Sequence, residues 1–407
     1  MKVSRKNLKR EFQYWSQIIL LPIYLLSHLS IRSKEIWLFG STFGSRFADN
    51  PKYFYLYMQQ YHKEIKSIWI TKNKSIAKRL KEKGYEAYYS KSLRGIYYCL
   101  RGKMYFFDNY SKDICFWLSG RAIKYNFWHG IPLKKIQMDN IFDKVRHPEN
   151  KAKQLYWSLR RLSDEKPSHY VLTTSNFLKP IFKSAFQTDK VEVYPYPRNE
   201  YLITNEIQNI YLCDEDKVLS RINKEHSNKR LVMYMPTFRE SEKKFFDVVE
   251  LGRFYSYLED SNILLIVKLH PKSKLKEQFQ KITSDTVVVL PAEYDPYPFL
   301  KSCDMLITDY SSIYFDFLLL DKPIIFFNYD LEDYLSESRE LYFDYDKFTP
   351  GIKAKTMDEL EIAIDNAINQ DEQWKKERSK IRDLVIENQS DDGLESLFRR
   401  IQDLIKQ

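Results

Sequence analysis

Two histidines in this sequence each follow an apolar, strand-like run directly. His129 follows "KYNFW", and His270 follows "ILLIVKL" with Lys272 close behind it. An imidazole titrates near neutral pH, so each side chain is suited to remove or to donate a proton. A single histidine after a strand is more often structural or a surface-loop residue. Other residues must therefore decide whether these two do chemistry.

Two more strand-like runs end in polar side chains of a matching kind. Thr237 and Arg239 follow one run, and the other, "MLIT", leads into Asp309, Ser311 and Ser312. An arginine can bond two phosphate oxygens at once, and a helix start offers free backbone N–H groups to an anion. This set predicts phosphoryl transfer, which needs positioned donors, positive charge and a base. The predicted donor-binding residues are Thr237, Arg239, Lys272, Thr308, Ser311, Ser312 and Asp316.

The stretch after this turn reads as a helix that is apolar nearly all round, which indicates burial. Its polar stripe is Ser312 and Asp316, four residues apart on one face. We expect this stripe to face the ligand, with Asp316 accepting from polyol or ribose hydroxyls. The alternatives are ordinary N-capping by a serine and a buried Asp316 that bonds a neighbouring loop. Asp309 is a poor neighbour for phosphate and is expected to brace the turn or orient a histidine.

Composition limits the classes of partner. Lys plus Arg exceed Asp plus Glu by 65 − 55 = +10 in 407 residues, which favours nucleic acid, an anionic membrane or a phosphorylated substrate. The four cysteines are scattered without a CxxC pair, which favours a reducing compartment. No dinucleotide fingerprint, P-loop, zinc spacing or G-x-S-x-G elbow is present. No carboxylate cluster calls for a metal, and we expect no required cofactor; the composition leaves dependence on a divalent metal undecided.

The N-terminal segment 1–34 combines basic and apolar residues. "MKVSRKNLKR" has five basic residues and no acid, and "IILLPIYLLSHLSI" follows it after a short gap. This apolar run is too short to span a bilayer, and no small-residue cleavage site follows it. The pattern predicts an interfacial anchor on anionic lipid, and the alternative is a first helix packed on the protein's own core.

The rest of the chain alternates strand-like and helix-like stretches, which predicts parallel sheets covered by helices. A polar stretch near residues 198–229 separates two such α/β halves. Ligands of open parallel sheets bind beyond the carboxyl ends of the strands, where the polar sets above fall. The expected strands are 35–41, 65–71, 103–109, 124–130, 170–175, 191–197, 230–236, 263–270, 286–291, 304–309 and 322–327. The basic, aromatic segment 134–162 is either a solvated helix pair or an excursion that faces the acceptor or the membrane.

Six motifs in a fixed order resemble the CDP-glycerol glycerophosphotransferase family, the teichoic-acid primases and polymerases and their capsule relatives. They are "WLFGSTFGSRFADNPKYFYLYM", "NFWHGIPLKKI", "YPYPRNEYL", "YMPTFRE", "KLHPKS" and "DMLITDYSSIYFDFLLLDKPIIFFNYDLEDY". The resemblance runs from about residue 35 to about 355. It implies a GT-B-like fold of two Rossmann-like domains facing a central cleft. We expect a membrane-associating segment at 1–34, an acceptor-side domain at 35–215 and a donor-binding domain with terminal helices at 216–407.

The resemblance also implies an activity, transfer of glycerol phosphate from CDP-glycerol to an acceptor hydroxyl with release of CMP. By motif, His129 and His270 are the catalytic candidates, with Gly130 and Asp309 in support. We expect His129 to be the base on the acceptor hydroxyl and His270 to contact the donor phosphate. The expected acceptor is a lipid-linked glycan or polyol phosphate at the cytoplasmic face of the membrane, with no nucleic acid partner. The alternatives are a CDP-ribitol enzyme, a sugar-nucleotide glycosyltransferase and a non-catalytic basic binding module.

Overall fold

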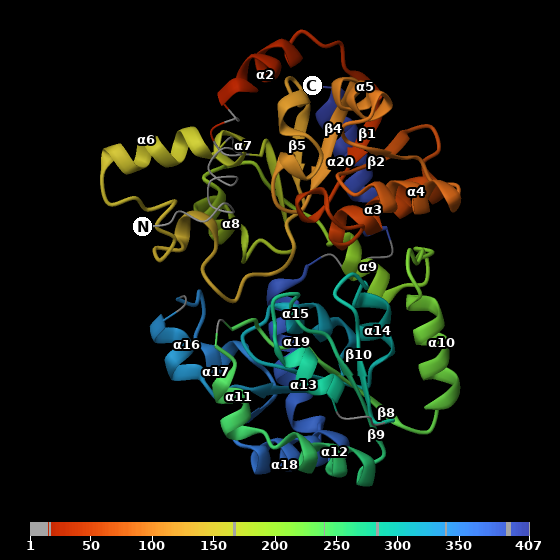
Figure 1. Cartoon of the computed structure of the whole chain (residues 1–407), viewed down its shortest axis with the longest axis vertical. Coiled ribbons are helices and arrows are strands. Elements are labelled where there is room, and N and C mark those ends of the chain that lie inside the picture. Colours follow the sequence, from red (N-terminus) through yellow and green to blue (C-terminus); the bar gives the residue numbers. More distant parts are fainter. Residues whose placement is uncertain are drawn as a thin grey trace. The chain divides into compact units, whose positions relative to one another are not determined.

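Two parallel β-sheets organise the fold, one in each of two compact units (Figure 1). The computed structural model describes residue 15 and residues 18–165, 168–239, 241–281, 285–337, 340–387 and 392–406. The first unit comprises residues 1–129, 136–212 and 387–407, and the second comprises residues 130–135 and 213–386. The predicted pair of Rossmann-like α/β halves is therefore confirmed.

The sheet of the first unit has seven parallel strands in the order β3-β2-β1-β4-β5-β6-β7. The strands are β1 Ser33–Phe39, β2 Lys66–Thr71, β3 Ala87–Tyr89, β4 Gly102–Phe107, β5 Ile123–Asn126, β6 Tyr170–Thr173 and β7 Val191–Val193. The helices are α2 Leu21–Ser27, α3 Asp49–Tyr61, α4 Lys74–Glu82, α5 Leu93–Arg101, α6 Lys151–Arg160, α7 Leu162–Glu165, α8 Lys179–Phe186, α9 Pro197–Ile203 and α20 Gly393–Lys406. Short 3₁₀ turns, among them η3 Phe116–Leu118 and η4 Gln137–Asp139, connect them.

The sheet of the second unit has six parallel strands in the order β10-β9-β8-β11-β12-β13. The strands are β8 Arg230–Tyr234, β9 Ile263–Val267, β10 Val287–Val289, β11 Met305–Thr308, β12 Ile324–Phe327 and β13 Ile352–Ala354. The helical segments are α10 Glu215–Glu225, α11 Lys243–Val248, α12 Leu251–Asp260, α13 Leu275–Lys281, α14 Tyr297–Ser302, α15 Ile313–Phe317, η5 Leu318–Leu320, α16 Leu331–Glu337, α17 Tyr345–Phe348, α18 Met357–Asn369 and α19 Glu372–Val385.

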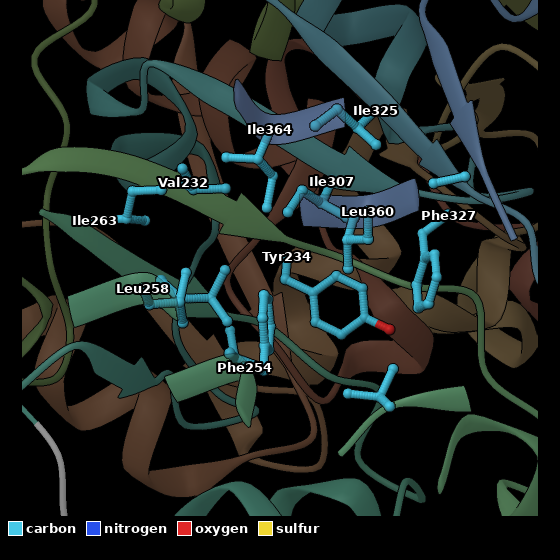
Figure 2. Packing of buried hydrophobic residues seen from close by; sticks show 14 of the residues in the cluster. Val232, Tyr234, Phe254, Leu258, Ile263, Ile307, Ile325, Phe327, Leu360 and Ile364 are labelled. Atoms are coloured by element: carbon cyan, nitrogen blue, oxygen red, sulfur yellow. The ribbon is translucent and has the colours of Figure 1, made fainter. Parts of the chain in front are cut away.

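Apolar side chains from the second sheet and its helices form one buried cluster (Figure 2). Strand residues such as Val232 and Ile307 meet Phe254 and Leu258 of α12 and Leu360 of α18 in this cluster. β9 is buried along its whole length, as expected for a central strand covered on both faces. The cluster fixes the sheet, so the loops beyond its carboxyl edge start from a rigid base.

The sequence pattern located most of the strands and missed two of them. These are β3 and β13, which stand in "YEAYYS" and "GIKAKT", where no run of aliphatic residues marks a strand. The Thr356 hydroxyl caps α18 by accepting the Glu359 N–H at 3.2 Å. The helix after the "DYSS" turn is shorter than expected, since α15 ends at Phe317 and a 3₁₀ turn follows it.

The C-terminal helix corrects the expected assignment of residues 216–407 to the second domain. Residues 387–407 belong to the first unit, where α20 packs beside β1 (Figure 1). Phe398 lies 5.5 Å from the Trp37 ring and 3.6 Å from the His62 ring, between centroids. Arg400 forms a two-pronged ion pair with Glu192 of β7. The apolar face of α20 thus completes the core of the first sheet.

The N-terminal segment is described at residue 15 and from residue 18 onward, and residues 1–14, 16 and 17 of the predicted anchor lie outside the described residues. One face of α2 packs on the first unit, where the Tyr24 ring stacks on Phe116 at 4.6 Å. The Ser27 hydroxyl accepts the Gly120 N–H at 2.9 Å. The opposite face exposes Leu25 and Leu26. Among the described residues, no helix has the length and apolar character that crossing a bilayer requires.

Candidate active site

His129 stands on a tight turn just beyond the carboxyl end of β5. Its ring is exposed, whereas Trp128 before it is buried. Trp128 has a φ of +53°, a left-handed conformation that is rare for a bulky residue. Such strain persists only where the surrounding structure fixes it, and it gathers at functional sites. The turn therefore presents the imidazole outward on a rigid support.

Buried polar side chains hold this turn from three directions. Asn50 of α3 donates to the Trp128 carbonyl at 3.0 Å. Arg198 of α9 donates to the His129 carbonyl at 2.9 Å and pairs with Asp49 at 2.8 Å. Asn126 accepts the Trp128 N–H at 2.8 Å. The sequence analysis gave none of these residues a role, although all of them fall inside the quoted motifs.

The hydrogen bond of the His129 ring fixes its tautomer. Nδ1 lies 3.0 Å from the carbonyl oxygen of Asp108, at the end of β4. A carbonyl can only accept, so Nδ1 carries the proton and neutral Nε2 carries the lone pair. The Asp108 carboxyl itself is buried, and burial together with nearby Asp113 raises its pKa well above the usual range. The role of His129 as a base stays a prediction.

His270 lies on the loop after β9 and has the opposite arrangement. Its Nδ1 accepts the backbone N–H of Lys272 at 3.3 Å, so the proton of the neutral ring is on Nε2. The Phe238 ring lies 4.8 Å away, between centroids. Partial burial and the Lys272 charge lower the pKa of His270. Glu242 anchors the loop by accepting the Ser273 hydroxyl and the Lys274 N–H.

Asp309 holds the "DYSS" turn against the loop after β8. Its carboxylate accepts the backbone N–H groups of Thr237 at 2.9 Å, Tyr310 at 2.5 Å and Ser311 at 3.2 Å. The same carboxylate accepts from the Arg239 guanidinium at 2.7 Å. These are the contacts of a brace. They fix the backbone of the turn, in which Ser311 and Ser312 are half-buried.

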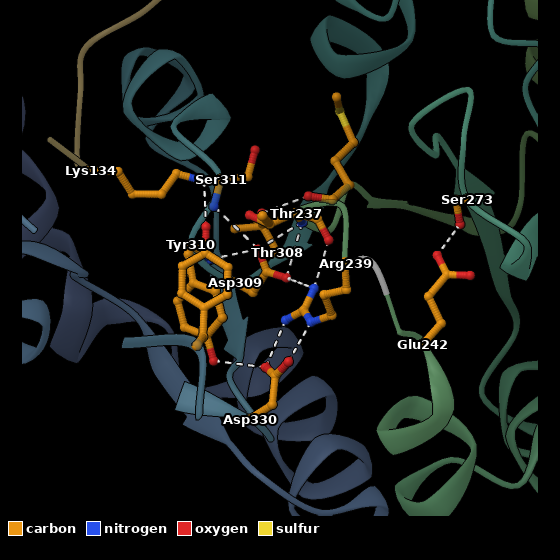
Figure 3. A network of polar contacts seen from close by, with 12 residues as sticks. Lys134, Thr237, Arg239, Glu242, Ser273, Thr308, Asp309, Tyr310, Ser311 and Asp330 are labelled. Carbon is orange, nitrogen blue, oxygen red and sulfur yellow. Dashed lines mark hydrogen bonds and ion pairs between the residues drawn. The ribbon is translucent and has the colours of Figure 1, made fainter. Parts of the chain in front are cut away.

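Arg239 is the centre of a buried ion-pair network (Figure 3). Its Nε and Nη2 bond both oxygens of Asp330, at 2.5 and 2.8 Å, while Nη1 bonds Asp309 and the Thr237 carbonyl. Burial alone would lower the pKa of the guanidinium, but Asp309 and Asp330 raise it above its usual value. Carboxylates therefore occupy the guanidinium atoms that were predicted to bind phosphate oxygens. The arginine side chain is also only 8% exposed. Its part in donor binding stays a prediction.

The other predicted donor residues divide into buried and accessible ones. The Thr308 hydroxyl donates to the Met235 carbonyl at 2.7 Å. Asp316 is fully buried and accepts the Tyr297 hydroxyl at 2.7 Å, so the alternative of a buried, bonded aspartate describes its position better than a ligand-facing stripe. Ser311 and Ser312 are half-buried, and Lys272 is exposed. The accessible hydroxyls therefore come from the two serines.

Two charged residues at this site were missed by the sequence analysis. Asp330 follows β12, which makes it a polar residue beyond a fifth strand end. The sequence "FFNYD" could have indicated it in the same way as the other four strand ends. Lys134 comes from the "PLKK" motif, whose segment 130–135 belongs to the second unit. Its ammonium donates to the Tyr334 hydroxyl at 3.2 Å, and the Tyr334 ring stacks on Tyr310 at 4.3 Å. Figure 3 shows the Lys134 side chain directed toward the Ser311 turn.

Strand order explains which of these residues come together. β9, β8 and β11 are neighbours in the second sheet, so the loops that carry His270, Thr237 and Ser311 share one sheet edge. Contacts from the β8 loop to Asp309 and from Phe238 to His270 join these three loops. His129 belongs to the first unit, at the carboxyl edge of its own sheet.

Two parallel Rossmann-type sheets, one in each unit, with polar groups beyond their strand ends define an α/β fold of the GT-B class. The chain belongs to the CDP-glycerol:poly(glycerophosphate) glycerophosphotransferase family, whose model matches residues 23–405. The family resemblance read from the motifs is confirmed.

The chain is similar to known teichoic acid enzymes. The chain is 28% identical over 349 residues to the teichoic acid poly(glycerol phosphate) polymerase of Bacillus subtilis, covering 84% of this chain and 45% of that protein. It thus spans less than half the length of that polymerase. It is 29% identical over 355 residues to the teichoic acid glycerol-phosphate transferase of Staphylococcus aureus, covering 80% of this chain and 82% of the relative.

Among solved structures, the wall teichoic acid polymerase TagF, in a variant soaked with CDPG, has a similar fold. The match has a TM-score of 0.73 and 22% identity, and it covers 99% of both chains.

Proposed function

We propose that this protein transfers glycerol phosphate from CDP-glycerol to the hydroxyl of an acceptor and releases CMP. The observation that carries the proposal is the pair of histidines with opposite tautomers, His129 and His270, at strand ends in a chain of this family. A transfer to a hydroxyl needs one group that takes a proton and one that stabilises the phosphate. The two tautomers supply these roles separately.

In the proposed step, Nε2 of His129 takes the proton of the acceptor hydroxyl. The acceptor oxygen forms a bond to the phosphorus that carries the glycerol, and the bond from that phosphorus to the bridging oxygen of the diphosphate breaks. CMP leaves with the electron pair of that bond. His270, with Nε2–H, donates a hydrogen bond to the negative charge that develops on the departing phosphate.

The donor diphosphate is proposed to lie at the Ser311–Ser312 turn. The two serine hydroxyls are accessible there, and Lys134 brings a cation next to the same turn. Arg239 cannot neutralise the diphosphate by itself, because two carboxylates already surround it. We therefore assign the donor phosphates to Lys134, Ser311, Ser312 and, from the His270 loop, Lys272.

The acceptor is proposed to be a lipid-linked glycan or polyol phosphate in teichoic acid or capsular polysaccharide synthesis, reached at the cytoplasmic face of the membrane. Exposed apolar side chains on and beside α2, among them Leu25, Leu26 and Leu29, support a peripheral contact with lipid. The basic first residues of the chain add attraction to anionic headgroups.

A donor-release assay tests the proposal. The protein is incubated with CDP-glycerol, CDP-ribitol and common sugar nucleotides, with and without lipid-linked acceptors, and released nucleotide is measured. We expect CMP from CDP-glycerol and a higher rate with acceptor. Release from CDP-ribitol alone would make the chain a ribitol-phosphate transferase, and release from a sugar nucleotide alone would make it a glycosyltransferase. Salt-sensitive lipid or nucleic acid binding that a double His→Ala variant retains, without any release by the wild type, would favour a binding module.

A further inference from the structure

Two buried carboxyl groups lie close to the turn that carries His129. Asp108 follows β4 directly, and Asp113 ends the short 3₁₀ turn η2 Ser111–Asp113. These residues are 1% and 0% exposed, and their carboxyls are hydrogen-bonded to each other. A carboxyl this deeply buried must be compensated by hydrogen-bond donors. The donors at Asp113 connect it to His129.

The peptide group between Asp108 and Asn109 joins Asp113 to His129. Its carbonyl oxygen, on Asp108, accepts from Nδ1 of His129 at 3.0 Å. Its N–H, on Asn109, donates to Oδ2 of Asp113 at 2.9 Å. These two bonds lie at opposite ends of one planar unit, and hydrogen bonds in such a chain polarise one another. An anion at the N–H end therefore makes the carbonyl a stronger acceptor for the His129 ring.

The negative charge of the carboxyl pair lies on Asp113. Among the described residues, the backbone N–H groups that donate to Asp113 are those of Phe43, Asn109 and Tyr110, at 3.0, 2.9 and 3.3 Å, and the one that donates to Asp108 is that of Thr42, at 2.9 Å. Burial and the neighbouring Asp113 raise the pKa of Asp108 well above its usual range. Burial also raises the pKa of Asp113, but the hydrogen bonds from Asp108 and the backbone, and the charge of Lys72, work against this. The shared proton is therefore on Asp108.

The alternative is that both carboxyls serve only the strained turn after β1. Thr42 and Phe43 have φ of +47° and +57°, a left-handed conformation. Their N–H groups donate to the two carboxyls, and the contact from Phe43 uses Oδ1 of Asp113. The Asn109 N–H uses Oδ2, an oxygen that this turn does not need. The turn therefore does not account for the bond to the peptide that holds His129.

We propose that Asp113 is a positioning residue, which keeps the His129 proton on Nδ1 through the peptide between Asp108 and Asn109. The inference rests on the proposed function, in which His129 is the base, and Asp113 lies outside all six quoted motifs. When Nε2 takes the proton of the acceptor hydroxyl, the ring becomes a cation and its bond to the Asp108 carbonyl strengthens. The charge on Asp113 stabilises this cation, as the carboxylate of a catalytic triad does by direct contact.

Kinetics of isosteric variants test the role of Asp113. We expect Asp113→Asn to lower kcat for CMP release by about tenfold or more, the scale for losing an outer hydrogen-bond partner of a histidine, and to leave KM for CDP-glycerol unchanged. Asp108→Asn should lose less, because its amide donates to Asp113 as the protonated acid does. Glu192→Gln is the control, since it weakens the ion pair with Arg400 in the same unit and should leave kcat unchanged.

NMR of protein labelled with ¹⁵N-histidine reads the tautomer of His129 without turnover, and the His129→Gln variant assigns its signals. We expect the neutral ring of the wild type to carry its proton on Nδ1, and the ring in Asp113→Asn to be a mixture of both tautomers. A proton on Nε2 in the wild type would overturn the proposal, even if Asp113→Asn fails to fold.

Three further outcomes bear on the link between Asp113 and His129. A folded Asp113→Asn variant with the kcat and the tautomer of the wild type would overturn it. An equal fall of kcat in Glu192→Gln would make the loss a general effect of stability and contradict a specific role. Absence of CMP release by the wild type would refute the proposed function, while the NMR measurement would still decide whether Asp113 sets the tautomer of His129.

Discussion

The two histidines differ in a single backbone contact, and this contact separates their chemistry. An acceptor carbonyl at Nδ1 leaves His129 with a basic Nε2, whereas a donor N–H at Nδ1 leaves His270 with an Nε2–H. The sequence shows that each histidine directly follows a predicted strand. It cannot predict the tautomers, because these depend on which backbone group a folded loop brings to each ring.

Glutamine substitutions distinguish the two roles. The amide of glutamine can donate a hydrogen bond but cannot take a proton at neutral pH. His129→Gln should therefore lower kcat by about a hundredfold or more, the scale of lost general-base catalysis. His270→Gln should retain more activity than His270→Ala, because the amide replaces the Nε2–H donor. CMP release with a saturating acceptor measures both, and equal losses in His270→Gln and His270→Ala would argue against a donor role for this ring.

Two adjacent lysines allow a matched test of the donor cation. Lys134 lies by the Tyr310–Tyr334 stack, whereas Lys135 pairs with Glu340 at 2.7 Å. We expect Lys134→Met to raise KM for CDP-glycerol by about tenfold, because a charge-assisted phosphate contact is lost. Lys135→Met should leave KM near the wild-type value, since exposed ion pairs contribute little. The same KM shift in both variants would indicate a general effect of charge and contradict a specific contact.

At the scale of elements, the site depends on loops that are tied to one another across neighbouring strands. The strand ends were predictable, since the strand-like runs "ILLIV" and "MLIT" precede His270 and Asp309. The ties between them were not, because Arg239, Asp309 and Asp330 are far apart in sequence and meet only once the order β8-β11-β12 is formed. The sequence does not show whether an arginine that follows a strand will bind phosphate or pair with a carboxylate.

The buried network predicts a stability defect in Arg239→Leu. Removing the guanidinium leaves Asp309 and Asp330 buried without their cation, which costs about 3–5 kcal/mol for a broken buried pair. Urea unfolding followed by circular dichroism measures the loss. Arg253→Leu is the control, because Arg253 pairs with Asp358 and Glu361 on the exposed surface of the same unit. Wild-type stability with a raised KM for CDP-glycerol would instead return Arg239 to the role of a phosphate ligand.

At the scale of the whole molecule, neither unit is a single continuous stretch of the chain. Segment 130–135 joins the second unit directly after His129, and α20 returns to the first. Neither crossing was predictable, since the amphipathic pattern of α20 shows only that the helix must bury a face. That the face packs on Trp37 follows from the tertiary fold. The crossing at residue 130 links the proposed base to the proposed donor cation Lys134 by a few residues of chain.

A deletion of the N-terminal segment is a poor test of the proposed membrane contact. Deletion of residues 1–33 would remove Tyr24 from Phe116, and it would remove Arg32, which donates to the carbonyls of Cys99 and Leu118 at 2.6 Å. A deletion therefore disturbs the first unit as well as its exposed surface. Substitutions on the exposed side avoid this, because Leu25, Leu26 and Leu29 are 60%, 64% and 78% exposed.

We expect the combined variant Leu25→Gln, Leu26→Gln and Leu29→Gln to bind anionic liposomes at least about tenfold more weakly, because apolar surface contributes about 25 cal/mol per Å² when it leaves water. Sedimentation with the liposomes measures the loss, and CMP release from soluble CDP-glycerol should stay unchanged. Leu93→Gln provides the control, since Leu93 is an exposed leucine of α5 in the same unit. Unchanged sedimentation of the triple variant would show that these leucines do not contact lipid, and an equal loss in Leu93→Gln would show that any exposed leucine has this effect.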